Sequence, residues 1–119
     1  MERYIKAKHL LVSLTGEPTG TIDPILEERG LKRRIVATVN QFAVAPRLLV
    51  NSDLIAVLPA RIVQISGLLD LLYFTSLPVE INLAPSTVKM MWHERNHRDS
   101  AQIWLRSRLI EICAQNLQN

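Results

Sequence analysis

The sequence predicts an α/β domain whose mainly parallel sheet is flanked by helices and followed by a C-terminal helix. Short runs of apolar and β-branched residues alternate with stretches of helical spacing, and glycine, proline and other turn residues separate them. Of the 119 residues, 48% are hydrophobic and 21% are charged, which suits one globular domain with a sizeable core. This strand–helix–strand order is typical of parallel sheets.

The first third of the chain is expected to form two strands with a short helix between them. Residues 9–14 (HLLVSL) and 33–39 (RRIVATV) have the composition of strands, and residues 21–30 (TIDPILEERG) that of a helix. Asp23 is placed to cap this helix, and Gly30 is placed to end it.

The middle third is expected to alternate helix, strand and helix. A helical pattern covers residues 40–50, but Pro46 fits a helix only in its first turn, so the helix should begin late, near Phe42, or be kinked. Residues 52–59 (SDLIAVLP) predict a strand that is buried on both faces. Residues 60–67 (ARIVQISG) predict a short helix that ends at a glycine.

Two more strands and a longer helix are expected toward the C-terminus. Residues 70–77 (DLLYFTSL) and 87–93 (TVKMMWH) are strand-like runs. Residues 99–115 predict a helix, because Asp99 can cap it, Gln102 follows three positions later, and apolar residues recur at helical spacing.

The distribution of charge argues against a nucleic-acid surface. The net charge is +3, but the basic residues are scattered, and residues 32–34 (KRR) form the one tight cluster. This cluster lacks interleaved aromatic residues and a recognition-helix pattern, so it is expected to be a solvated turn between a helix and a strand.

The sequence favours a cytoplasmic location and no membrane contact. Charged residues precede the first apolar run, so the long apolar region of a signal peptide is missing. No stretch approaches the roughly 18 apolar residues of a membrane helix. The single cysteine, Cys113, excludes an internal disulfide and suits a reducing compartment. We expect Cys113 to face inward on the last helix with Leu109 and Ile112, and Trp92 and Trp104 to be packing residues.

Residues 93–97 (HERNH) match the zinc-binding pattern H-E-x-x-H. That chemistry requires both histidines on one helix face and a third ligand, for which Glu111 is near in sequence. The pattern instead follows an extended run and precedes a polar gap before the capped helix, so we expect it on a strand end and a loop. A zinc-dependent hydrolase using His93, Glu94 and His97 is the alternative from another class.

Other catalytic patterns are weaker. The sequence has no G-x-S-x-G elbow, no phosphate-binding G-x-x-x-x-G-K-[ST] loop and no G-x-G-x-x-G after a strand. Ser13, His9 and Asp23 could be written as a triad, but a chain of this size offers such a trio by chance. We therefore expect neither catalytic residues nor a cofactor or metal.

Two stretches carry a resemblance to a known family. Residues 9–62, with the pieces VSLTGEPTG, GLKRRIVATV and SDLIAVLP, are followed in order by residues 90–109, with WHER and AQIWLR. This ordered set resembles the C-terminal part of the effector-binding domain of LysR-type transcriptional regulators.

The resemblance implies the second lobe of a domain similar to type II periplasmic binding proteins. Residues from about 5 to 85 would form most of that lobe, residues 86–95 a strand that crosses back, and residues 99–115 a helix that packs on a first lobe. Members of the family bind DNA through a winged helix-turn-helix domain, and these residues contain no such motif. DNA would therefore be a partner only through a domain absent from this chain.

Two groups of residues are candidates for an inducer site. In two-lobed α/β proteins, ligands sit beyond the carboxyl ends of the strands, near helix N-termini, where free N–H groups favour a carboxylate or another polar acceptor. The candidates follow the two predicted strands and are Ser13, Thr15, Gly16, Asn40, Gln41 and Phe42. Turn formation and helix capping are an equal alternative for the polar residues, and core packing is one for Phe42.

The function that the resemblance implies is regulation by a small-molecule inducer. An inducer that closes the two lobes would shift the population of states in which the regulator holds DNA. An exposed apolar side of the last helix, and the edge of the crossover strand, would favour self-association. A stand-alone solute-binding or adaptor module is a further alternative.

Overall fold

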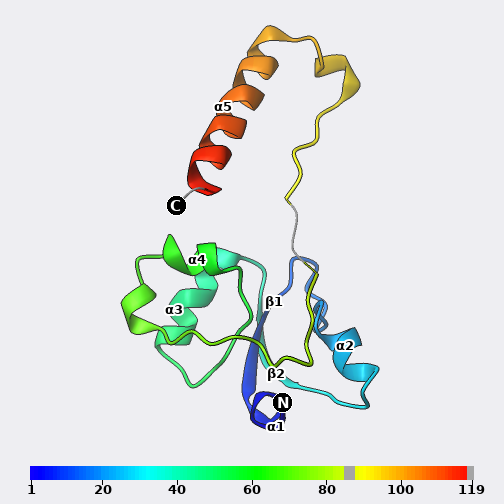
Figure 1. Ribbon diagram of the computed structural model, residues 1–119, viewed down its shortest axis with the longest axis vertical. Coiled ribbons are helices and arrows are strands. Elements are labelled where there is room, and N and C mark those ends of the chain that lie inside the picture. The colour runs from blue at the N-terminus through cyan, green and yellow to red at the C-terminus, as the bar shows by residue number, and fades with distance from the viewer. Residues whose placement is uncertain (85–87, 118–119) are drawn as a thin grey trace. The chain divides into compact units, whose positions relative to one another are not determined.

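The computed structural model describes residues 1–84 and 88–117 (Figure 1). The chain divides into two units, Met1–Ala84 and Pro85–Asn119. The helices and strands of the first unit are α1 (Glu2–Lys6), β1 (Lys8–Val12), α2 (Asp23–Glu27), β2 (Arg34–Val39), η1 (Phe42–Val44), α3 (Ala45–Val50), α4 (Ala60–Gln64) and η2 (Leu69–Leu71). Those of the second unit are η3 (Glu94–Asn96) and α5 (Ser100–Leu117).

The sheet confirms the predicted parallel α/β arrangement. β1 pairs with β2 in parallel, from Lys8 opposite Arg34 to Val12 opposite Val39, and the register shifts after His9. α2 lies on one side of the two strands, and α3 and α4 lie on the other (Figure 1). Because the strands are parallel, both carboxyl ends lie at the same edge of the sheet.

A third extended segment reaches β1 but is shorter than predicted. Ile55 forms an isolated parallel bridge with His9. The Leu10 N–H donates to the Ile55 carbonyl at 2.9 Å, and the Ile55 N–H donates to the Lys8 carbonyl at 2.9 Å. The prediction of a strand over residues 52–59 is therefore wrong in extent, and also in burial, because Ile55 is 37% exposed. With one bridge only, this segment does not extend the sheet by a full third strand.

The helix ends follow the predicted turn chemistry. At the end of α2, Gly30 has a φ of +66°, and the Leu31 N–H donates to the Leu26 carbonyl at 2.9 Å. This is the Schellman arrangement, which requires a left-handed residue and so favours glycine. After α4, Gly67 has a φ of +70°. The late start predicted near Phe42 is confirmed, because η1 begins there and Pro46 lies in the first turn of α3.

Two predicted strands do not form. The segment predicted as a strand over residues 70–77 begins within η2 and then lacks regular structure, and Tyr73 is 93% exposed. Residues 88–93 also form no strand, and residue 87 lies outside the described residues. In both stretches the apolar residues have no neighbouring strand in the described part of the chain, and a strand cannot satisfy its backbone groups alone.

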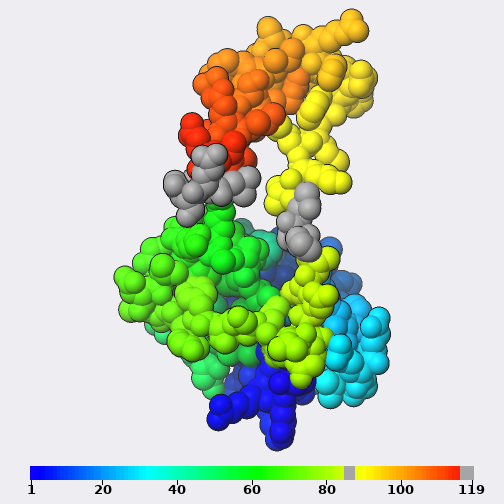
Figure 2. All heavy atoms as spheres, in the orientation of Figure 1, coloured from blue at the N-terminus to red at the C-terminus, as the bar shows by residue number. Residues whose placement is uncertain are grey.

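The core of the first unit lies between α2 and the segment before residue 85. Ile22, Leu26 and Ile81 are buried together, with Leu26 1% exposed. Figure 2 shows the yellow-green segment of residues 76–84 lying against the cyan region of α2. Leu10 in β1 and Ala45 in α3 are also buried.

The second unit begins its helix where the sequence predicted. The Asp99 side chain accepts a hydrogen bond from the Gln102 N–H at 2.8 Å, which is an N-cap contact. The prediction that Cys113 faces inward is wrong in this structure, because Cys113 is exposed, and Leu109 is 43% exposed. Trp104 is 64% exposed, which contradicts its predicted packing role. Among the described residues, no helix is both long and apolar enough to cross a membrane.

Candidate functional site

A hollow of about 340 Å³ lies at the carboxyl ends of β1 and β2. We call it the strand-end hollow, and its lining residues are Ser13, Gly16, Thr38, Val39, Asn40 and Val44. The two strand ends are held together because the Ser13 N–H donates to the Val39 carbonyl at 2.8 Å. After β1 the chain continues into the loop of residues 14–19, and after β2 it continues into η1. The hollow lies between these two segments.

Ser13 is the most buried polar group of the strand-end hollow. The residue is only 7% exposed, and because it lines the hollow, its hydroxyl is accessible to a molecule bound there. A ligand or water oxygen in the hollow would accept a hydrogen bond from this hydroxyl.

The lining combines polar groups with an apolar wall. Thr38 and Asn40 add a hydroxyl and an amide, whereas Val39 and Val44 are apolar. None of the six lining residues carries an ionisable side chain, so recognition here would depend on hydrogen bonds and apolar contact.

Three of the six predicted site residues line the hollow. They are Ser13, Gly16 and Asn40. Gly16 has a φ of +82°, which other residues rarely adopt, so the turn after β1 requires glycine at this position. The sequence rule that places ligands beyond parallel strands is sufficient to find these three.

The other three predicted residues have local structural roles. The Thr15 hydroxyl accepts a hydrogen bond from the Glu17 N–H at 3.4 Å, which stabilises the turn. Gln41 is the residue before η1 and is exposed, and Phe42 begins η1 and is half-buried. Sequence reasoning missed Thr38, Val39 and Val44, although Thr38 and Val39 directly precede the predicted Asn40.

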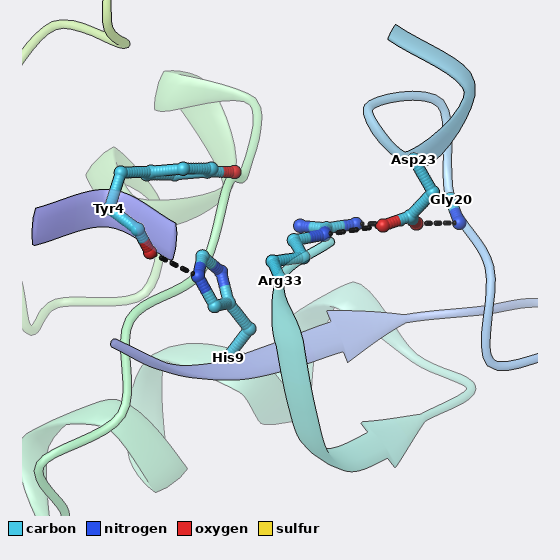
Figure 3. A network of polar contacts seen from close by, with 5 residues as sticks. All are labelled: Tyr4, His9, Gly20, Asp23 and Arg33. Carbon is cyan, nitrogen blue, oxygen red and sulfur yellow. Dashed lines mark hydrogen bonds and ion pairs between the residues drawn. The ribbon is translucent and has the colours of Figure 1, made fainter. Parts of the chain in front are cut away.

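A buried ion pair lies between α2 and the start of β2 (Figure 3). The Arg33 Nε donates to Asp23 Oδ1 at 2.8 Å, and Arg33 Nη2 donates to Asp23 Oδ2 at 2.8 Å. The Arg33 side chain is 3% exposed and that of Asp23 is 14% exposed. The prediction of a solvated turn at residues 32–34 is therefore wrong for Arg33, whose charge is neutralised inside the unit, although Lys32 and Arg34 are exposed.

The Asp23 carboxylate also accepts a hydrogen bond from the Gly20 N–H. Asp23 was predicted to cap α2, but its side chain reaches back to a residue before the helix, and no side-chain cap bond is present at the helix start. Burial raises the pKa of the Asp23 carboxyl, but hydrogen bonds from Arg33 and Gly20 outweigh it, so the pKa lies below its ordinary value. Burial lowers the pKa of the Arg33 guanidinium, but its hydrogen bonds with Asp23 and the Asp23 charge outweigh this effect, so the pKa lies above its ordinary value.

His9 occupies the same buried network (Figure 3). Its Nε2 lies 2.7 Å from the Tyr4 carbonyl, so Nε2 carries the hydrogen, and the buried Nδ1 has no partner among the described residues. Burial is the main cause of a lowered pKa for His9, and the positive charge of Arg33 adds to it. The trio of Ser13, His9 and Asp23 forms no relay, because His9 bonds to Tyr4 while Asp23 bonds to Arg33 and Gly20.

A second hollow, of about 390 Å³, lies beside the basic run. We call it the α2–β2 hollow, and its lining includes Pro18, Thr19, Asp23, Leu26, Leu31 and residues 32–35. Because Arg33 and Asp23 neutralise each other, the remaining charged residues of its lining are Lys32, Arg34 and the acidic Glu27.

The H-E-x-x-H pattern lies on a short 3₁₀ turn, not on an α-helix. His93 has extended backbone, and its Nδ1 accepts a hydrogen bond from the Arg95 N–H at 3.1 Å. The His97 Nδ1 accepts one from the Trp92 indole N–H at 3.3 Å. The two imidazoles therefore do not lie one turn apart on an α-helix, and the prediction that the pattern lies outside a helix of that kind is confirmed. No group of three or more histidine, cysteine or acidic side chains that could hold a metal occurs in the described residues.

Trp92 and His97 are part of a cluster around the entry to α5. Their rings are stacked at 6.1 Å, and the Arg106 guanidinium lies 4.5 Å from the Trp92 ring centroid. Arg106 Nη2 donates to the His97 carbonyl at 2.9 Å. This cluster fixes the turn that leads into the helix, which is a structural role for the residues of the pattern.

Comparisons with known proteins bear on the family and the fold. No family model matches the chain. The chain is 29% identical over 112 residues to the HTH-type transcriptional activator NahR of Pseudomonas putida, a match that covers 94% of this chain. It is 31% identical over 115 residues to Nodulation protein D 3 of Rhizobium leguminosarum bv. phaseoli, which covers 96% of this chain. The crystal structure of the regulatory domain of MexT, a transcriptional activator in Pseudomonas aeruginosa, matches with a TM-score of 0.61, 29% identity and 91% coverage of this chain.

The chain is a relative of the LysR-type transcriptional regulators. It spans 37% of the length of NahR and of Nodulation protein D 3, and 53% of the MexT regulatory domain. The structural match falls in a regulatory domain, so the resemblance to the effector-binding part of LysR-type proteins is confirmed. NahR and MexT are transcriptional activators by name, and these comparisons give no support to the zinc hydrolase.

Proposed function

We propose that this chain is the effector-binding part of a LysR-type transcriptional regulator and that it binds a small molecule in the strand-end hollow. The observation that carries the proposal is Ser13, a polar residue that is only 7% exposed and that lines a hollow at the carboxyl ends of two parallel strands. The regulatory domain of MexT supports the same role for this part of the fold.

The chemistry of the hollow favours a small amphipathic ligand that accepts hydrogen bonds, such as a carboxylate. Ser13, Thr38 and Asn40 offer donors, and Val39 and Val44 offer apolar contact. A ligand with one carboxylate and one apolar group would use both kinds of surface. In the whole regulator, such a ligand would shift the balance between states that hold DNA differently. DNA contact would come from a helix-turn-helix domain outside residues 1–119.

Calorimetric titration with benzoate, butyrate and acetate tests the proposal. We expect benzoate to bind most tightly, because it buries the largest apolar area. An Asn40→Ala variant and a Ser13→Ala variant should each weaken binding by about fivefold to tenfold, the loss of one hydrogen bond. Thr75→Ala is the matched control, because Thr75 is exposed and does not line the hollow. Equal affinity in all four chains would contradict the proposed site.

Self-association and a cytoplasmic location are further parts of the proposal. α5 exposes large apolar side chains, including Trp104 at 64% and Ile110 at 60%. Exposed apolar surface of this kind favours contact with another chain or domain. Sedimentation of the 119-residue chain should show a dimer or larger species, and Trp104→Glu should shift it toward monomer. A wild-type chain that sediments as a monomer at all concentrations would contradict this part.

A further inference from the structure

The loop between β1 and α2 is attached to the rest of the unit at both ends. At its first end, the Ser13 N–H donates to the Val39 carbonyl at 2.8 Å. At its second end, the Gly20 N–H donates to the Asp23 carboxylate, and the Asp23 N–H donates to the Gly20 carbonyl at 3.0 Å. Residues 14–19 between these ends are exposed.

This loop contributes to the strand-end hollow through Gly16. Within the loop, the Gly16 N–H donates to the Ser13 carbonyl at 3.4 Å, and the Glu17 N–H to the Thr15 hydroxyl at 3.4 Å. Both bonds are long and exposed, so they constrain the loop weakly. The position of Gly16 therefore depends on where the two ends are held.

The second attachment is rigid because Asp23 is itself fixed. Two hydrogen bonds at 2.8 Å join its carboxylate to Arg33, whose side chain is 3% exposed. A bidentate pair of this kind sets the orientation of the carboxylate as well as its position. Gly20 fits closely against the pair, because a Cβ at Gly20 would lie 2.8 Å from Leu11 Cδ1 and 3.2 Å from Arg33 Nη2.

We infer that Asp23 is a positioning residue for the ligand site: held by Arg33, it anchors Gly20 and thereby sets the place of Gly16 in the strand-end hollow. Asp23 does not line that hollow, so it acts through the loop. This inference rests on the proposed function for its effect on ligand affinity, whereas the anchoring of the loop stands without it.

Three variants of the 119-residue chain test the inference. Asp23→Asn keeps the shape of the side chain but removes the charge that holds Arg33 and Gly20. Gly20→Ala keeps both charged side chains but adds a Cβ that would lie 2.8 Å from Leu11 Cδ1, so the loop end must shift. Val63→Ala is the control, because Val63 is 3% exposed in α4 and outside both hollows, so this variant lowers stability without touching the loop.

The first measurement is amide hydrogen exchange of Gly16, Glu17, Thr19 and Gly20 without ligand, at a temperature where all four chains are folded. We expect exchange at these amides to be faster in Asp23→Asn and Gly20→Ala, and unchanged in Val63→Ala. Exchange that is equal in Asp23→Asn and the wild type overturns the anchoring.

The second measurement is the affinity for benzoate. We expect Asp23→Asn and Gly20→Ala to raise the Kd about tenfold, while Val63→Ala leaves it unchanged at the same temperature. A loss of affinity in Val63→Ala as large as that in Asp23→Asn overturns the positioning role, because general loss of stability would then explain it. If the wild type binds no benzoate, the proposed function fails at this probe, and hydrogen exchange alone decides the anchoring.

Discussion

In residues 1–84, Leu10, Leu26 and Ala45 are at most 1% exposed and an ion pair is buried, whereas in residues 88–115 every described side chain is at least partly exposed. The first unit therefore holds its fold with a core of its own. The second unit depends on local contacts, namely the Asp99 cap and the cluster around Trp92. The comparison teaches that the first unit carries the strand-end hollow on a core of its own, whereas α5 exposes its large apolar side chains.

The largest effect is expected from removing one partner of the buried ion pair. Arg33→Met leaves the Asp23 carboxylate buried without its cation and should lower the free energy of unfolding of the first unit by about 4 kcal/mol. Urea denaturation at pH 7, followed by circular dichroism, measures this. Arg34→Met is the matched control, because Arg34 is exposed and should change the value by less than about 0.5 kcal/mol. Equal losses in the two variants would show that the pair is not buried as described.

Substitution of an apolar side chain should also lower stability more in the first unit than in the second. Leu26→Ala removes a side chain that is 1% exposed and should cost the first unit about 3 kcal/mol. Leu105→Ala, in α5, removes one that is 46% exposed and should cost less than about 1 kcal/mol. Both tryptophans lie in the second unit, so tryptophan fluorescence reports on that unit and amide signals of β1 and β2 report on the first. A large loss in Leu105→Ala would mean that α5 is packed in solution.

The helix cap of the second unit should have a smaller effect. Asp99→Ala removes the bond to the Gln102 N–H and should destabilise α5 by about 1 kcal/mol, which lowers its helix content in circular dichroism. Asp99→Asn should retain most of the helix, because asparagine caps about as well as aspartate. Loss of helix in Asp99→Asn equal to that in Asp99→Ala would contradict a capping role.

The smallest effect near neutral pH is expected from His9. Burial holds the pKa of His9 in the folded unit below its ordinary value of 6.5. The stability that neutral His9 contributes is thus fully present above pH 6.5 and is lost as the pH falls from there toward the lowered pKa. Urea denaturation of the first unit between pH 7.5 and 5.5 should show this decline, and His9→Gln should flatten it. The lowered pKa of Asp23 acts only at more acidic pH, below about 3.8. His97→Gln, in the other unit, should leave the decline unchanged; a flattened decline in that variant would rule out His9 as its source.

The predictable parts of the fold were those set by local chemistry. Gly30, Pro46 and Asp99 act through their own backbone preferences or through contacts within one helical turn, and their roles could be read from spacing. The strands over residues 70–77 and 88–93 could not be judged in this way, because a strand depends on a partner that lies far away in the sequence.

The same distinction applies to the candidate site. Ser13, Gly16 and Asn40 follow directly after strands, so the rule for parallel sheets finds them. The partnership of Asp23 with Arg33 joins residues ten positions apart across a turn, and Asp23 was instead predicted as a cap and Arg33 as a solvated charge. Propensity favours both of those roles for isolated residues, and only the tertiary fold reveals the pair.

The central claim is that the first unit binds a small molecule where β1 and β2 end, and nuclear magnetic resonance of the amide groups during titration with benzoate tests it most directly. The account predicts saturable shifts that concentrate at Ser13, Gly16 and residues 38–41. Shifts that concentrate instead at residues 32–35 of the α2–β2 hollow, or along α5, would contradict it.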